Sequence, residues 1–185
     1  MTSYEKMEFV IRLARKAMDN GEFPIAAIIY HGDDIIASAY TTENADGRFL
    51  VHAEQKALME ADMRKLPIRE RRNLELYTNL EPCLMCLGTA ISSFVGKIYY
   101  SVEAPDDGSV ELVSREYERR GDAEISSQFP FPEIHSGLFR DQSIQLFREF
   151  VELNKDKPGV CYAKTIAELK LSVNKPNARP AKIGE

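Results

Sequence analysis

Four side chains in the sequence have the types and the spacing of a metal-dependent hydrolytic centre. His52 is followed two residues later by Glu54, while Cys83 and Cys86 are three positions apart in the segment PCLMC. One imidazole and two thiolates suit a borderline-soft ion, and zinc is the commonest such ion in proteins. Three protein ligands leave a fourth position for water, as catalytic zinc sites do. Glu54 is near enough in sequence to exchange a proton with that water without being a ligand itself.

This H-x-E…P-C-x-x-C pattern resembles the cytidine/deoxycytidylate deaminase superfamily, and within it the branch of cytosine, guanine and tRNA adenosine deaminases. The resemblance extends over roughly residues 4–102. It implies one Zn²⁺ per chain, held by His52, Cys83 and Cys86, with Glu54 as the catalytic proton shuttle. It further implies hydrolysis of a cyclic amidine C–N bond, which releases ammonia from a nucleobase or nucleoside of the aminopurine or cytosine type.

The resemblance also implies a substrate contact ahead of the histidine. Members of the superfamily hydrogen-bond the base through an asparagine that precedes the metal-binding histidine. Asn44 is the candidate here, although it stands closer to His52 than in the usual pattern, so Thr41 and Thr42 remain alternatives. An asparagine that only caps the loop explains Asn44 equally well.

Two further contacts follow from the same resemblance. The backbone N–H groups of Ala53 and Cys83 are expected to stabilise the carbonyl end of the reaction or to orient the water. Pro82 is expected to shape the turn that presents Cys83 to the ion and the substrate.

Length and composition set limits on the remaining possibilities. The chain has 185 residues, which indicates one domain with a sizeable core. With 24 Lys and Arg against 29 Asp and Glu, its formal net charge is −5, so no basic surface for nucleic acid is evident. Two of its three cysteines are assigned to the metal, which excludes a disulfide framework and suits a reducing cytoplasm. We find neither a signal peptide nor a membrane-spanning run.

Hydrophobic periodicity and turn residues predict the order of the elements. The first helix is expected to run from a capping box at Thr2 and Glu5 to a stop at Asn20 and Gly21. The remaining predicted segments are strands 23–30 and 35–40 as a hairpin, a loop 41–50, helix 52–66, a connection 67–73, strand 74–78, helix 83–94, strand 97–101, helix 110–120, an irregular stretch 121–137, and helices 142–153 and 160–171.

The fold class expected from the resemblance is α/β, a three-layer α-β-α sandwich with a mixed five-stranded sheet flanked by helices and extra C-terminal helices. Right-handed crossovers between parallel strands would bring the starts of helices 52–66 and 83–94 to one edge of the sheet. We expect a deaminase domain over residues 1–172, with a motif-bearing core at 4–102 and a helical extension at 103–172. Residues 173–185 are expected to form a flexible tail.

Three functional hypotheses compete. The first is a deaminase of a small-molecule nucleobase or nucleoside, which forms a homodimer by resemblance and binds neither membrane nor nucleic acid. The extension after residue 102 favours it, since a lid over the pocket would obstruct a folded anticodon loop. The second is a tRNA adenosine-to-inosine deaminase. The third is a non-catalytic zinc-stabilised interaction domain, which Glu54 argues against because a structural site needs no proton shuttle.

Overall fold

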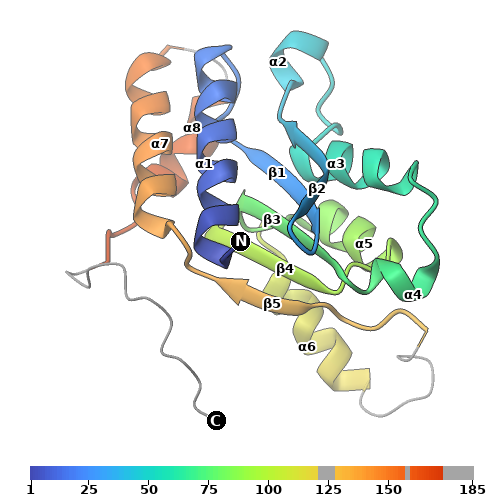
Figure 1. Cartoon of the computed structure of the whole chain (residues 1–185). Helices are drawn as coiled ribbons and strands as arrows, with labels where there is room; N and C mark the ends of the chain where they lie inside the picture. Colours follow the sequence, from blue (N-terminus) through green and yellow to red (C-terminus); the bar gives the residue numbers. More distant parts are fainter. Residues whose placement is uncertain (121–127, 157–158, 173–185) are drawn as a thin grey trace.

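The computed structural model describes residues 1–120, 128–156 and 159–172. A five-stranded sheet with the order β2-β1-β3-β4-β5 lies between two layers of helices (Figure 1). β1 pairs antiparallel with both β2 and β3, whereas β3, β4 and β5 are mutually parallel neighbours. The expected three-layer sandwich with a mixed sheet is therefore confirmed. The strands are β1 (Ala26–His31), β2 (Asp34–Tyr40), β3 (Leu74–Leu80), β4 (Lys97–Val102) and β5 (Glu133–Ser136).

The helices divide between the two faces of the sheet. On one face lie α1 (Ser3–Asp19) and α7 (Arg140–Leu153), with α8 (Val160–Ala167) packed against α7. On the other face lie α3 (Ala53–Asp62), α5 (Leu84–Ser92) and α6 (Val110–Arg120). Two single-turn helices, α2 (Glu43–Asp46) and α4 (Ile68–Arg71), lie in the connections before α3 and β3. Among the described residues, no helix combines the length and apolar character that a membrane crossing requires.

The first helix forms as its sequence predicts. The Thr2 side chain accepts a hydrogen bond from the Glu5 backbone N–H (3.2 Å), and the Glu5 carboxylate accepts one from the Thr2 backbone N–H (2.7 Å). This capping box satisfies two of the donors that a helix start leaves unpaired. Asn20 ends the helix, and Gly21 follows with φ +81°, a left-handed conformation that glycine adopts without strain.

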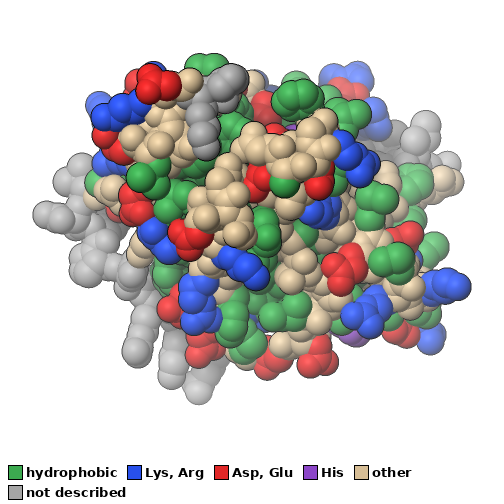
Figure 2. All heavy atoms as spheres, turned by 90° about the horizontal axis from the view of Figure 1, so that it is seen from above, with side chains coloured by type: hydrophobic (Ala, Val, Ile, Leu, Met, Phe, Trp, Pro, Cys, Tyr) green, Lys and Arg blue, Asp and Glu red, His purple; other side chains and the backbone are tan. Residues whose placement is uncertain are grey.

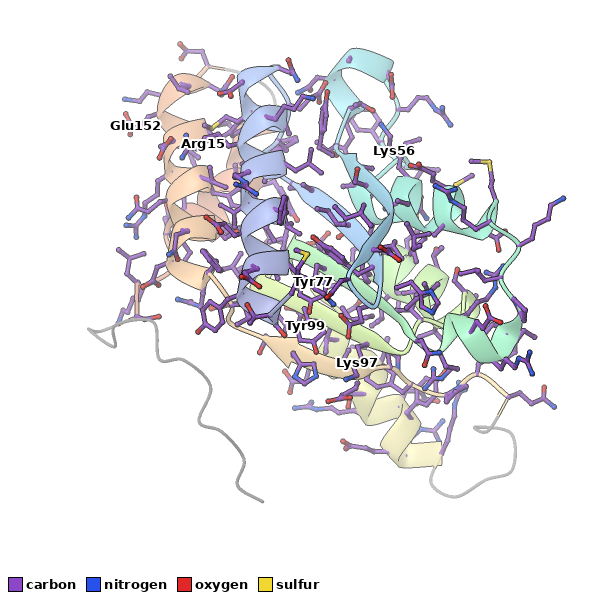
Figure 3. The ribbon with its side chains drawn as sticks, in the orientation of Figure 1. Arg15, Lys56, Tyr77, Lys97, Tyr99 and Glu152 are labelled. Atoms are coloured by element: carbon purple, nitrogen blue, oxygen red, sulfur yellow. The ribbon has the colours of Figure 1, made fainter. Side chains whose placement is uncertain are left out.

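Two apolar cores, one on each face of the sheet, hold the layers together. On the α1 face, the rings of Tyr77 on β3 and Tyr99 on β4 stack with centroids 4.3 Å apart (Figure 3), and His135 on β5 stacks on Tyr99 at 4.4 Å. Cross-strand pairs of this kind stabilise a sheet beyond the area they bury. They therefore fix the register of the three parallel strands, and β3 leads directly to the cysteines.

Several sequence expectations need correction. The predicted helix 52–66 ends at Asp62, and the predicted helix 160–171 ends at Ala167. β1 begins at Ala26 rather than at residue 23, because Ile25 N–H closes a turn onto the Phe23 carbonyl at 2.7 Å. The loop 41–50 and the connection 67–73 each contain a single-turn helix. Residues 133–136, expected to be irregular, form β5 by pairing with β4. A segment of four residues is too short to show the hydrophobic alternation that predicts a strand. This strand forms because its backbone pairs with a neighbouring strand in the folded protein. The predicted tail 173–185 lies outside the described residues.

Candidate metal centre and adjoining cavity

The three predicted metal ligands meet at the starts of two helices. His52 is the N-cap residue of α3 and Cys83 that of α5, with Cys86 in the first turn of α5. His52 Nδ1 lies 3.5 Å from each cysteine Sγ, and the three ligand atoms all lie within 4.8 Å of one another. The parallel pair β3–β4 and its crossover helix α5 place the cysteines at the sheet edge where α3 also begins. The expectation that both helix starts share one edge is thus confirmed.

The pKa values of the three ligand side chains are shifted by their contacts with one another. A hydrogen bond from Cys86, reinforced by His52, lowers the pKa of Cys83 to about 4. The hydrogen bond with the Cys83 sulfur raises the pKa of His52 to about 9. Cys86 shows the opposite shift, since its hydrogen bond to Cys83 and its burial raise its pKa. A metal ion binds the deprotonated forms of cysteine and histidine, so its binding displaces the protons that these side chains carry.

The donor set fits zinc. Zn²⁺ in proteins is bound by thiolate sulfur and imidazole nitrogen in tetrahedral geometry, and three protein ligands are typical of its catalytic sites. The nearness of the three ligand atoms means that no rearrangement of the two helices is needed to bring them around one ion. His52, Cys83 and Cys86 can therefore hold a zinc ion, as the sequence predicts.

Glu54 lies beside the ligands in the first turn of α3. Its side chain is buried, with one carboxylate oxygen 3.7 Å from Cys86 Sγ and the other accepting a hydrogen bond from Thr78 Oγ1 at 3.4 Å. Burial raises the pKa of this carboxyl to about 7. The group is thus held next to the metal ligands.

A cavity of about 280 Å³ opens onto the cluster. Its volume is close to the lower end of the range for small-molecule sites, about 300–1,000 Å³. Four carboxylate side chains line it, and no lysine or arginine does among the described residues. The lining residues are Phe23, Ile25, Thr41, Glu43, Phe49, His52, Ala53, Glu54, Leu80, Glu81, Cys83, Asp107, Gly159 and Tyr162.

Hydrogen bonds connect the loop that follows β4 to Glu81 and Pro82, the two residues before Cys83. The Glu81 carboxylate accepts hydrogen bonds from the backbone N–H groups of Ala104 (3.2 Å) and Val110 (3.0 Å). The Pro82 carbonyl accepts from the backbone N–H (3.2 Å) and the hydroxyl (3.0 Å) of Ser109. These bonds satisfy buried groups at both ends of the loop and hold the intervening residues against the cavity.

Asp107 and Tyr162 close one wall of the cavity. Tyr162 on α8 donates its hydroxyl to Asp107 Oδ1 at 3.0 Å, and its ring meets that of Phe23 edge-on with centroids 6.1 Å apart. Burial raises the pKa values of both Asp107 and Tyr162. Residues after position 102 therefore contribute directly to the cavity wall.

The residues that the sequence analysis proposed as substrate contacts differ in their position relative to the cavity. Ala53 lines the cavity, whereas Pro82 does not and uses its carbonyl to bind Ser109. The Asn44 side chain points away from the cavity, since its amide donates to the Gly21 carbonyl at 2.9 Å. Of the two alternatives, Thr41 is 1 % exposed and lines the cavity, whereas Thr42 is not among the lining residues.

Sequence reasoning did not find Glu43, Asp107 or Tyr162. Glu43 adjoins Asn44 in the 41–50 loop, so its position in that loop is the sequence signal that could have identified it. Asp107 and Tyr162 are 55 residues apart and belong to no motif, and only the folded chain brings them together.

Comparison with known proteins identifies relatives over most of the chain. The family profile described as the cytidine and deoxycytidylate deaminase zinc-binding region matches residues 2–102. A tRNA-specific adenosine deaminase of Rickettsia typhi is 29% identical over 148 residues, which are 79% of this chain and 95% of that protein. The tRNA-specific adenosine deaminase of Bacillus subtilis is 34% identical over 102 residues, 55% of this chain and 63% of that protein.

Solved structures point to the same fold and to two kinds of activity. One, from a study of A-to-I editing by tRNA:A34 deaminases, superposes with a TM-score of 0.62 at 26% identity and covers 76% of this chain and 96% of its own. Another, a guanine deaminase from Nitrosomonas europaea, gives a TM-score of 0.59 at 25% identity over 80% of this chain and 84% of its own. The tRNA-specific relatives do not support the expectation that nucleic acid is excluded as a partner.

Proposed function

Because the chain belongs to the cytidine and deoxycytidylate deaminase family, we propose that it hydrolyses the exocyclic amine of a free nucleobase or nucleoside, with zinc as cofactor. The observation that carries the proposal is the cavity beside the zinc ligands, which is lined by carboxylates and by no lysine or arginine of the described residues. The overall reaction adds water to the amidine-like ring carbon and expels ammonia, which leaves a ring carbonyl.

Each site residue has a distinct role in this proposal. Zinc, when bound, supplies a Lewis acid that makes water acidic enough to attack near neutral pH. Glu54 takes a proton from the attacking water and later delivers it to the departing amine. Thr78, by its hydrogen bond to one oxygen of Glu54, holds the carboxylate in the orientation that this transfer needs.

The cavity wall formed by Asp107 and Tyr162 favours a substrate rich in N–H donors. Tyr162 occupies Asp107 Oδ1, and no described residue donates to Oδ2, which can accept from a ring or exocyclic N–H group. Aminopurines and cytosine carry such donors on the edges of their rings. A phosphate at this position would meet carboxylates and no lysine or arginine of the described residues, so a base or nucleoside fits better than a nucleotide.

The alternative is a tRNA adenosine-to-inosine deaminase, and it is supported by the tRNA-specific relatives. An enzyme that binds folded RNA neutralises several phosphates with clustered Lys and Arg side chains. On the face seen in Figure 2, acidic and basic side chains are interspersed rather than gathered by sign. This distribution and the net charge of −5 favour the small molecule.

Ammonia release distinguishes the two substrates. The zinc-loaded enzyme is incubated with adenine, guanine, cytosine and their nucleosides, and in parallel with deacylated tRNA whose inosine content is measured by mass spectrometry. We expect at least one free compound to be deaminated faster than tRNA. Inosine formation in tRNA at a rate above that for every free compound would overturn the proposal in favour of the alternative. Glu54→Gln protein, purified identically, controls for contaminating deaminases.

Two remaining expectations stand as proposals. A non-catalytic zinc domain is disfavoured, because Glu54 is buried beside the ligands at the energetic cost of desolvating a carboxyl group. The homodimer is supported by the exposed apolar side chains of Leu50, Met59 and Met63, which line one groove of the surface, since such side chains gather at interfaces.

A further inference from the structure

His52 presents one ring nitrogen to the cysteines and the other to a carboxylate. Its Nδ1 atom lies 3.5 Å from both sulfurs, while Nε2 lies 3.5 Å from Glu43 Oε1. This last distance is that of an ion pair and is slightly longer than an ordinary N–H···O hydrogen bond. Both side chains are largely shielded from water, with 28% of His52 and 18% of Glu43 exposed.

The placement of Glu43 has its own support. Glu22, only 2% exposed, accepts hydrogen bonds from the backbone N–H groups of Asn44 (2.9 Å) and Ala45 (2.8 Å). Asn44 returns a bond from its side-chain amide to the Gly21 carbonyl at 2.9 Å. A buried carboxylate that receives two backbone donors is a strong anchor. It fixes the backbone on the C-terminal side of Glu43.

A second contact ties the same segment to α3. Lys56 on α3 donates its ammonium group to the hydroxyl of Thr42 at 2.8 Å, and Thr42 immediately precedes Glu43. The segment that carries Glu43 is therefore held by two contacts, one from Glu22 and one from Lys56 on α3. Neither contact involves the metal ligands, so the carboxylate is placed in advance of metal binding.

We propose that Glu43 is a positioning residue for the zinc ligand His52. Its carboxylate accepts a hydrogen bond from the Nε2–H group of the imidazole and so keeps the Nδ1 lone pair directed at the ion. Metal-bound histidines commonly donate their other N–H group to a carboxylate, which fixes the tautomer and the ring orientation. Glu22 acts one step further out, by holding the segment that carries Glu43.

This inference depends on the zinc site and not on the proposed substrate, so its test measures metal binding rather than turnover. Zinc affinity is determined by competition with a chromogenic chelator. Removal of such a partner typically weakens metal affinity about 10–100-fold. We expect a loss of that size for Glu43→Ala and a smaller loss for Glu43→Gln, whose amide oxygen still accepts a hydrogen bond. The matched control is Glu60→Gln on the exposed face of α3, which should retain wild-type affinity.

A second measurement separates positioning from general damage to the fold. Proton–nitrogen correlation spectra of the histidine rings should show His52 of the zinc-loaded protein protonated at Nε2, with a slowly exchanging proton. Glu43→Ala should speed that exchange in the folded protein. Wild-type zinc affinity together with unchanged exchange in Glu43→Ala would overturn the proposal, even if the variant had an altered KM.

The role of Glu22 is tested by a double-mutant cycle. If Glu22 acts through Glu43, Glu22→Gln lowers zinc affinity in the wild-type background but adds nothing in the Glu43→Ala background. Additive losses would show that Glu22 acts by another route and would overturn that part of the proposal.

Discussion

Glu54 is the residue whose chemistry is most separable from that of the metal. It lies beside Cys86 and accepts a hydrogen bond from Thr78, but it is not one of the three residues whose atoms cluster around the metal position. Its proposed role is to move protons, so removing its charge should not release the ion. A glutamine at this position is nearly the same size and can still accept the hydrogen bond from Thr78.

We therefore expect Glu54→Gln to bind zinc stoichiometrically and to lose at least about a hundredfold in turnover, the usual contribution of a positioned acid–base group. Elemental analysis and the rate on the best substrate measure the two properties. The control, Glu60→Gln, should lose neither. Near-native turnover in Glu54→Gln would show that another group carries the proton.

At the residue scale, the sequence predicted the metal ligands because their spacing reflects local geometry. His52 and Cys83 each cap a helix, and the two-residue gap between the cysteines brings both sulfurs to one side of the same helical turn. The wall of the cavity could not be predicted in this way. Tyr162 reaches Asp107 only because α8 packs on α7, which in turn packs on the sheet. No sequence spacing encodes such a contact.

At the scale of elements, Asn79 joins three segments near the metal centre. Its side-chain oxygen accepts from the Ala26 N–H at 2.8 Å, and its amide donates to the Pro24 carbonyl at 2.8 Å and to the Ser143 hydroxyl at 3.2 Å. Ser143 on α7 returns a bond to the Asn79 carbonyl at 2.7 Å. Asn79 thus links the start of β1, the end of β3 and α7.

Asn79→Ala should destabilise the fold because it leaves the Ala26 N–H and the Pro24 carbonyl buried without partners. Each such group costs about 1–3 kcal/mol, so we expect the free energy of unfolding to fall by about 2–6 kcal/mol. Urea denaturation measures the change. Asn73→Ala, at an exposed position just before β3, should stay within about 0.5 kcal/mol of wild type. Equal midpoints for the two variants would contradict the structural role of Asn79.

The elements themselves were predictable to different degrees. Helices with strong periodicity or caps, such as α1, follow from local sequence. β5 does not, because its four residues become a strand only by pairing with β4. The 41–50 loop is intermediate, since its polar composition indicated a loop while the short helix α2 inside it depends on the buried carboxylate of Glu22.

On the scale of the whole molecule, zinc connects parts of the chain that the sheet alone holds in register. His52 and the cysteines are 31 and 34 residues apart, and they begin the two helices that pack together on one face of the sheet. A ligand that binds only the folded chain stabilises it by mass action. Stability of the whole domain should therefore depend on the metal.

Removal of zinc should lower the melting temperature of the entire domain. With free zinc at about a thousand times its dissociation constant, binding contributes about 4.1 kcal/mol, which for a protein of this size corresponds to roughly 8–16 °C. Scanning calorimetry with and without a strong chelator measures the shift. Cys86→Ala should lose the zinc-dependent increase in melting temperature, because only two of the three metal ligands then remain. Cys161→Ser should retain it, since Cys161 is exposed on α8 and is not one of the clustered ligands. An identical melting temperature for the metal-free and zinc-loaded wild type would contradict a site that is coupled to folding.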